Sequence, residues 1–170
     1  MEKENNEMAN KLTRVLVVMV VCLALGGLPA AAAERFTDNG DGTVTDHLLG
    51  LMWAKSDNHG DISWNQAQRW VTYTFPDTLP RHYSDWRLPT LVELKSLYVA
   101  EKKDRGYEAD CGQWVKIVPA IRLSCGWVWT SEVDKIAPTA MIFNFHRGVH
   151  YSDRKVHSRA YRALPVRSLP

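Results

Sequence analysis

The chain has 170 residues, a formal net charge of +2 at pH 7, and 45% hydrophobic residues. A chain of this length and hydrophobicity can form one domain with its own core. The nearly balanced charge argues against a nucleic-acid partner, because proteins that bind phosphate backbones are usually strongly basic.

The N-terminal segment, residues 1–33, has the pattern of a secretory signal peptide. Lys11 and Arg14 form a positively charged region before an almost unbroken apolar run from Val15 to Leu28. The three alanines ending at Ala33 are the small residues that a signal peptidase recognises. The run is short for a membrane span, and an uncleaved N-terminal anchor is the alternative. We therefore expect residues 34–170 to form a single periplasmic or secreted domain with no membrane span after cleavage.

The stretch FTDNGDGTVTD, Phe36 to Asp46, suits either a hairpin or a calcium loop. An EF-hand loop needs oxygen ligands at fixed positions around a glycine, and neither frame that places Gly42 or Asp38 correctly supplies them. Asn-Gly and Asp-Gly dipeptides favour tight turns, because glycine adopts positive φ without steric cost. We therefore predict a hairpin in which Asp38, Asp41 and Asp46 do not form a calcium site.

Two segments have the start signals and the apolar spacing of helices. Ser63 with Gln66 and Thr90 with Glu93 are capping-box patterns. The apolar residues that follow recur at helical spacing, so one face of each helix is expected to enter the core. These residues are Trp64, Ala67, Trp70 and Val71 in the first helix, and Leu91, Leu94, Leu97 and Tyr98 in the second. The prolines in residues 72–84 predict a loop.

Short strands are predicted in most of the remaining chain. One lies around Leu51–Trp53, and others lie at 126–130, 140–145 and 159–167, while residues 101–112 are polar and predicted to be irregular. The order of these elements predicts a compact α+β domain, with two helices early and a mainly antiparallel sheet of short strands.

Cysteine and tryptophan residues give further information on the core. Cys111 and Cys125 are the two cysteines after residue 33, and an even pair in an exported chain predicts a disulfide. All seven tryptophans also follow residue 33. Trp64 and Trp70 share the apolar helix face, and Trp127 and Trp129 share one side of a strand, so we interpret these four as core residues, with sugar stacking as the alternative.

Five stretches taken together resemble the Lcl C-terminal domain family of bacterial exported proteins. They are RFTDNGDGTVTDHLLGLMWAK, SWNQAQRW, DWRLPTLVELKSL, WVWTSE and YRALPVR, and they span most of the chain from Glu34 to Arg167. The resemblance implies a C-type-lectin-like fold that is also similar to the formylglycine-generating enzymes. It further implies a binding role, since the family's namesake is an adhesin module for sulfated polysaccharides.

The chain also departs from its relatives. Val71 stands where many of them have a cysteine, and the acid–Pro–Asn tripeptide of calcium-dependent lectins is absent. Glu132 is the one carboxylate of the Trp129–Glu132 stretch, where such lectins have Trp–Asn–Asp. A calcium-dependent sugar site is therefore not expected.

No catalytic or cofactor motif is found, and we predict neither an enzyme nor a cofactor. His146, His150 and His157 could contact zinc, but no cysteine and only Asp153 lies nearby to complete the ligands, so no metal site is predicted. Two alternatives stay open. One is an oxidoreductase related to the formylglycine-generating enzymes, with Cys111 and Cys125 as copper ligands, and the other is a structural subunit of an envelope assembly.

The C-terminal segment from Asn144 to Pro170 has six basic residues and one acidic residue, Asp153. Side chains alternate along a strand, which places Arg159, Tyr161 and Arg167 on one side of the last predicted strand and Arg162 on the core side with Leu164 and Val166. We therefore expect Arg162 to be structural. The predicted anion-binding residues are Arg147, Arg154, Lys155 and Arg159, and the predicted function is a non-enzymatic module that binds an anionic polysaccharide or another cell-envelope component.

Overall fold

The computed structural model describes residues 34–100 and 106–170. The predicted signal peptide lies outside the described residues, as does part of the segment predicted to be irregular. Within the described parts of the chain, no helix is long and apolar enough to cross a membrane.

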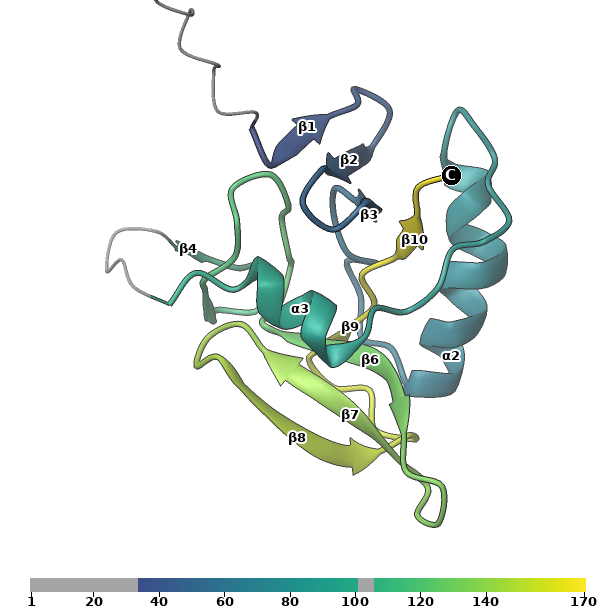
Figure 1. The fold of residues 1–170 in the computed structure, drawn as a ribbon. Helices are drawn as coiled ribbons and strands as arrows, with labels where there is room; N and C mark the ends of the chain where they lie inside the picture. Colours follow the sequence, from purple (N-terminus) through teal and green to yellow (C-terminus); the bar gives the residue numbers. More distant parts are fainter. Residues whose placement is uncertain (1–33, 101–105) are drawn as a thin grey trace, which may run out of the picture. The chain divides into compact units, whose positions relative to one another are not determined.

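The first sheet brings the two ends of the domain together (Figure 1). It consists of β1 (Phe36–Asp38), β2 (Thr43–Asp46), β3 (Leu51–Ala54) and β10 (Val166–Ser168), in the antiparallel order β1-β2-β3-β10. The predicted hairpin is confirmed, since Asp38 pairs with Val44 and the turn contains Gly40 and Gly42 at φ 74° and 88°. Both glycines adopt the left-handed conformation that other residues rarely take.

The second sheet provides the framework of the candidate site. Its strands are β6 (Trp127–Val133), β7 (Thr139–Asn144), β8 (Val149–Arg154) and β9 (Tyr161–Arg162), in the order β8-β7-β6-β9. Only β9 pairs in parallel within this sheet. A separate pair consists of β4 (Tyr107–Glu108) and β5 (Trp114–Val115). Of these two strands, β4 lies in the segment that the sequence predicted to be irregular, and β5 follows that segment.

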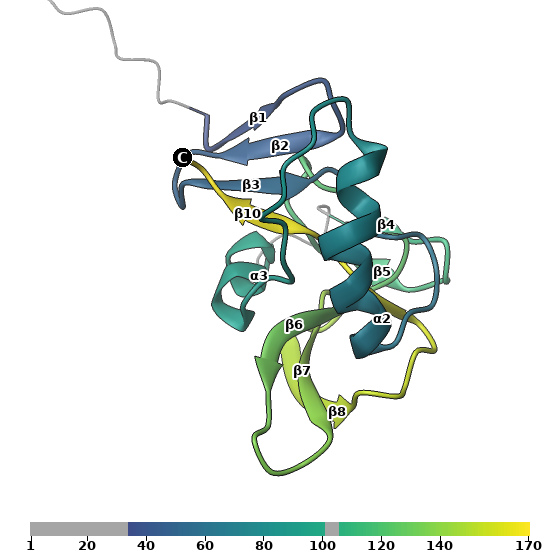
Figure 2. The same ribbon diagram turned by 90° about the vertical axis from the view of Figure 1, so that its right-hand side faces the viewer.

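Two helical segments pack between and beside the sheets (Figures 1 and 2). α2 (Trp64–Arg69) and α3 (Leu91–Leu97) begin at Ser63 and Thr90, and both predicted capping boxes are present. As predicted, Ala67 and Val71 are fully buried in the first segment, and Leu94 and Leu97 in the second.

The predicted loop from residue 72 was wrong at its start. The chain continues from α2 through a π-helical segment η1 (Trp70–Thr74) and a 3₁₀ turn η2 (Phe75–Thr78). The Phe75 ring is buried, with its centroid 5.4 Å from that of Trp70 and 4.8 Å from that of Trp86. Pro76 lies in the first turn of η2, where a missing N–H costs little, so its presence does not end the helical chain.

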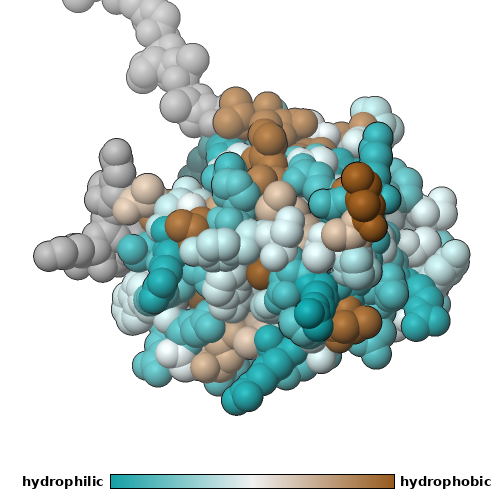
Figure 3. All heavy atoms as spheres, turned by 90° about the horizontal axis from the view of Figure 1, so that it is seen from below, coloured by the Kyte–Doolittle hydropathy of each residue, from teal (hydrophilic) through white to brown (hydrophobic). Residues whose placement is uncertain are grey.

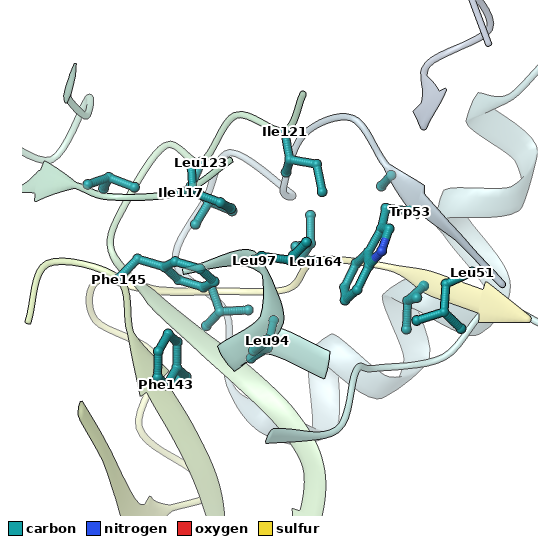
Figure 4. Close-up of a cluster of buried hydrophobic side chains, with 14 of the residues drawn as sticks. Leu51, Trp53, Leu94, Leu97, Ile117, Ile121, Leu123, Phe143, Phe145 and Leu164 are labelled. Carbon is teal, nitrogen blue, oxygen red and sulfur yellow. The ribbon is translucent and has the colours of Figure 1, made fainter. Parts of the chain in front are cut away.

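The hydrophobic core joins both sheets to α3 (Figure 4). Trp53 of β3, Leu94 and Leu97 of α3, and Phe143 of β7 are all fully buried and converge there. A second cluster, which includes Trp129 and Ile142, packs on the other side of β6 and β7 against Ala67 and Val71. The domain is therefore α+β, with two helices and mainly antiparallel short strands, as the sequence predicted.

The last predicted strand is in fact two strands in different sheets. β9 and β10 are separated by Ala163, Leu164 and Pro165, so the alternation of sides does not continue from one to the other. Arg162 is buried, which confirms its structural role. The prediction that Arg167 shares an outer side with Arg159 was wrong, because Arg167 is buried with its guanidinium 4.1 Å from the centre of the Tyr83 ring and its Nε 2.7 Å from Asp85.

Candidate anion-binding surface

The structure places the four predicted anion-binding residues at three positions. Arg147 is exposed in the turn before β8, and Arg154 is exposed at the other end of this strand. At about 3.3 Å per strand residue, roughly 20 Å separates them. Arg154 pairs with Thr139 and shares its side with His150, whereas Tyr151 and Asp153 share the opposite side with Ile142 and Ala140. Arg147 and Arg154 therefore do not join the remaining two residues.

Lys155 and Arg159 lie in the connection from β8 to β9, next to the start of α2. The Lys155 Nζ atom is 4.6 Å from the centre of the Trp64 ring, a cation–π contact. The Lys155 backbone also accepts a hydrogen bond from Trp64 N at 3.0 Å and donates one to the carbonyl of Pro138 at 2.9 Å. These bonds fix the position where the basic connection begins.

Arg159 is held on a loop that folds against Asp61. The backbone N–H of Ala160 donates to Asp61 Oδ1 at 3.0 Å, and Ala160 itself has a positive φ of 64°. Hydrogen bonds from Arg162 and Ala160 lower the pKa of Asp61, and the positive charges of Arg162 and Arg159 add to this effect. The Arg159 side chain is exposed, so it is free to contact a ligand from solvent.

Both carboxylate oxygens of Asp153 accept hydrogen bonds from within the surface. Its Oδ1 accepts hydrogen bonds from Arg154 N at 2.7 Å and from His157 Nδ1 at 2.9 Å, and its Oδ2 accepts one from the Tyr161 hydroxyl. Burial opposes ionisation of Asp153, but the hydrogen bonds from Tyr161 and His157 outweigh it and lower the pKa of this carboxyl. Burial and the contact with Asp153 raise the pKa of Tyr161, which stays a neutral donor.

Aromatic rings extend from this network across the sheet. The Tyr161 ring centre is 4.8 Å from that of Trp129 and 6.2 Å from that of Trp127, and Trp127 is 6.0 Å from Tyr151. Trp129 is fully buried as predicted, and its Nε1 donates to the carbonyl of Ile62 at 2.9 Å. Trp127 is only half-buried, and Tyr151 is 53% exposed. The two outer rings therefore belong partly to the surface.

A shallow hollow of about 350 Å³ lies among these side chains. His157, Arg159 and Tyr161 line it together with Val156 and Ser158. We call the following set the basic aromatic surface: Trp127, Tyr151, Lys155, His157, Arg159 and Tyr161. Figure 3 shows the molecule from below Figure 1, where β7 and β8 lie. This face is mainly hydrophilic and has separate hydrophobic patches.

Sequence reasoning missed Tyr151 and favoured a core position for Trp127, with sugar stacking as the alternative. The signal was present in the strand sequence VHYSDR, in which Tyr151 alternates in step with Asp153. Their association with Trp127 and Tyr161 depends on the pairing of β8, β7, β6 and β9, which no local pattern specifies.

Two buried polar residues near this surface, Arg162 and Asp57, have structural partners. Arg162 donates from Nε to Ser124 Oγ at 2.7 Å and from Nη1 to Asp61 at 2.8 Å. The buried carboxylate of Asp57 accepts hydrogen bonds from Ser124 N and Oγ at 2.7 and 2.8 Å. This network ties the segment before Cys125 to β9.

The predicted disulfide between Cys111 and Cys125 is present, with its Cα atoms 5.4 Å apart. The copper-binding alternative needs these two sulfurs as thiolates, and they are joined to each other. His146 Nδ1 bonds the carbonyl of Trp114 at 2.8 Å. Across residues 34–100 and 106–170, no group of three or more His, Cys, Asp or Glu side chains could hold a metal ion.

A comparison with protein families matches residues 42–167 to the model described as the Lcl C-terminal domain. The chain belongs to the Lcl C-terminal domain family. The matched residues include both helices and the whole basic aromatic surface. They also include both sheets, apart from β1 and the last residue of β10. No curated protein matches the chain.

Proposed function

We propose that this member of the Lcl C-terminal domain family is an exported, non-enzymatic module that binds an anionic polysaccharide or another anionic component of the cell envelope. The ligand contacts the basic aromatic surface, where Arg159 and Lys155 supply positive charge and Tyr151 and Trp127 supply ring faces. Its place of action is the periplasm or the exterior of the cell.

The observation that supports this proposal is the position of Arg159 and His157 around a hollow beside partly exposed aromatic rings. A guanidinium forms paired hydrogen bonds with sulfate or carboxylate oxygens. Asp153 is the one acidic residue of the segment, and its oxygens already accept bonds from Tyr161, His157 and Arg154. Among the described residues, Asp153 pairs with neither Lys155 nor Arg159, so it does not compete with a ligand for these two cations.

The aromatic rings add a second kind of contact. The faces of sugar rings carry C–H groups, and covering them with an aromatic side chain removes apolar area from water. Tyr151 and Trp127 lie next to each other and connect through Tyr161 to the hollow. A chain of sugars with acidic groups matches this combination better than a free small anion does.

Heparin affinity of two charge-reversal variants tests the proposal. The variant Lys155→Glu/Arg159→Glu changes the basic aromatic surface, while Arg147→Glu/Arg154→Glu makes the same change in net charge at the two separated positions. We expect the first variant to elute from heparin at clearly lower salt than the second, since exposed ion pairs weaken as salt screens them. Equal elution of the two folded variants would contradict the proposal.

A further inference from the structure

A second and larger hollow, of about 700 Å³, lies on a part of the domain that shares no lining residue with the basic aromatic surface. It opens between Lys55, which follows β3, and the segment Pro119–Arg122. Tyr107 of β4 and Ile117 complete its apolar wall. This volume is in the range of binding sites for small molecules. The lining of such sites is mostly apolar, with a few polar groups at defined positions.

The wall of this hollow is fixed by the fold. Ile117 and Ile121 are buried at the edge of the main core, as Figure 4 shows. The Tyr107 hydroxyl donates to the carbonyl of Leu123 at 3.0 Å and accepts from Leu123 N at 2.5 Å, so its single proton is already used within the fold. The pocket is therefore already formed without a ligand, which reduces the entropy cost of binding.

Two cations border the apolar wall. The backbone N–H of Arg122 donates to the carbonyl of Lys55 at 2.9 Å, which keeps the two residues side by side. The Arg122 guanidinium lies 4.7 Å from the centre of the Tyr107 ring and, among the described residues, has no acidic partner. Lys55 pairs with Asp38, and this contact lowers the pKa of Asp38. Within residues 34–100 and 106–170, the rim therefore has one cation paired with Asp38 and one cation, Arg122, without an acidic partner.

We propose that this pocket binds a small amphipathic anion, meaning a molecule with a flat apolar body and one sulfonate, sulfate or carboxylate group. The apolar body contacts Ile117, Ala120 and Ile121, and the anionic group bonds Arg122, with Lys55 as the second cation. Burial is the main cause that raises the pKa of Tyr107, and the charges of Asp57 and Asp110 add to it, but neither of these acids lines the pocket. The site does not depend on polysaccharide binding at the basic aromatic surface.

A matched pair of fluorescent probes tests this site in the purified protein. Anilinonaphthalene sulfonate has the apolar rings and a sulfonate, and N-phenyl-1-naphthylamine has the same rings without the charge. We expect the sulfonate to bind about tenfold more tightly, because a hydrogen bond to a charged group is worth roughly that factor. Arg122→Gln is expected to remove the difference, and Ala120→Leu to weaken both probes by filling the pocket. Arg69→Gln, a matched change on α2, is expected to leave both affinities unchanged.

Amide chemical shifts recorded with each probe locate the binding. Shifts at Tyr107, Ala120 and Arg122 in a protein that keeps its cooperative thermal transition support the pocket. Equal affinity for the two probes, an unchanged preference in Arg122→Gln, or shifts at Arg159 and Tyr151 instead would overturn the proposal. Heparin binding is measured separately, so failure at one site leaves the other result intact.

Discussion

The guanidinium of Arg35 binds both carboxylate oxygens of Asp46, with Nε 3.0 Å from Oδ1 and Nη2 2.7 Å from Oδ2. Asp46 is fully buried, and its Oδ1 also accepts from Leu48 N at 3.1 Å. The same Arg35 donates to the carbonyl of Ser96 at 2.9 Å, which connects the first hairpin to α3. One acidic residue of the stretch Phe36 to Asp46 therefore has a structural role, because its ion pair with Arg35 helps to hold the first hairpin against α3.

Replacing Asp46 with asparagine is expected to lower the free energy of unfolding by about 2 kcal/mol, because Arg35 loses its charged partner in a partly buried place. Asp77→Asn on η2 is the matched control, since Asp77 is exposed and substitutions of this kind usually change stability by less than about 0.5 kcal/mol. Urea unfolding of the two variants measures both effects. Equal stability would show that the ion pair contributes nothing.

The same pair predicts how stability depends on pH. Burial raises the pKa of Asp46, but the bonds from Arg35 outweigh it, so the pKa in the folded protein is below its ordinary value. The unfolded pKa of an aspartate is about 3.9, so the ion pair stabilises the fold fully above that pH and this contribution is lost as pH falls through the folded pKa. The stability difference between wild type and Asp46→Asn should therefore shrink below about pH 4, and a difference that grows on acidification would contradict this assignment.

Calcium is expected to leave the melting temperature unchanged. Besides the pair at Asp46, Asp38 contacts Lys55, and Asp41 Oδ1 accepts from Thr43 N at 3.1 Å and from its hydroxyl. A ligand that binds only the native state must stabilise it. Millimolar calcium added to chelator-treated protein in a thermal scan measures this directly, and a rise of many degrees would restore the calcium-loop interpretation.

Loss of the disulfide is expected to destabilise the domain by about 3 kcal/mol, by the loop-entropy estimate. The variant Cys111→Ala/Cys125→Ala tests this in urea. Intact mass after alkylation, with and without reductant, checks the bond itself. Alkylation of both thiols without reductant would contradict the structure.

Gly148 is expected to tolerate alanine poorly. Its φ is +71°, and an added Cβ would lie 2.5 to 2.9 Å from the outer atoms of the Tyr98 ring. That ring packs edge-on against Phe143, with centroids 5.8 Å apart, so it has little room to move. Gly112 has a similar φ of +77° with nothing within 4 Å, so Gly112→Ala measures the backbone cost alone. We expect Gly148→Ala to lower the free energy of unfolding by about 1 kcal/mol more than Gly112→Ala does. Equal melting temperatures of the two variants would show that the Tyr98 ring moves aside without cost.

Local features of this domain were predictable from the sequence, and distant associations were not. The capping boxes at Ser63 and Thr90 and the turn around Gly40 depend on a few neighbouring residues, so their patterns identified them. The burial of Arg162 followed from strand alternation. Arg167 was misplaced because Pro165 lies between two strands of different sheets, and the alternation ends there.

The candidate site was predictable only in part for the same reason. Lys155 and Arg159 are close in sequence and lie in the same connection between β8 and β9, whereas Arg147 and Arg154 are separated by the length of β8. The contacts of Lys155 with Trp64 and of Tyr151 with Trp127 join segments that are far apart in the chain. Such contacts depend on the order of strands in the sheet, which composition and periodicity do not specify.

The most direct test of polysaccharide binding is a chemical-shift map of the isotope-labelled protein titrated with a heparin hexasaccharide at low salt. The proposed function predicts that the largest changes occur at Lys155 to Tyr161, at Tyr151 and at the indole N–H of Trp127, and that they diminish as salt is added. Changes confined to Arg147, or no changes in the basic aromatic surface at saturating ligand, would contradict it.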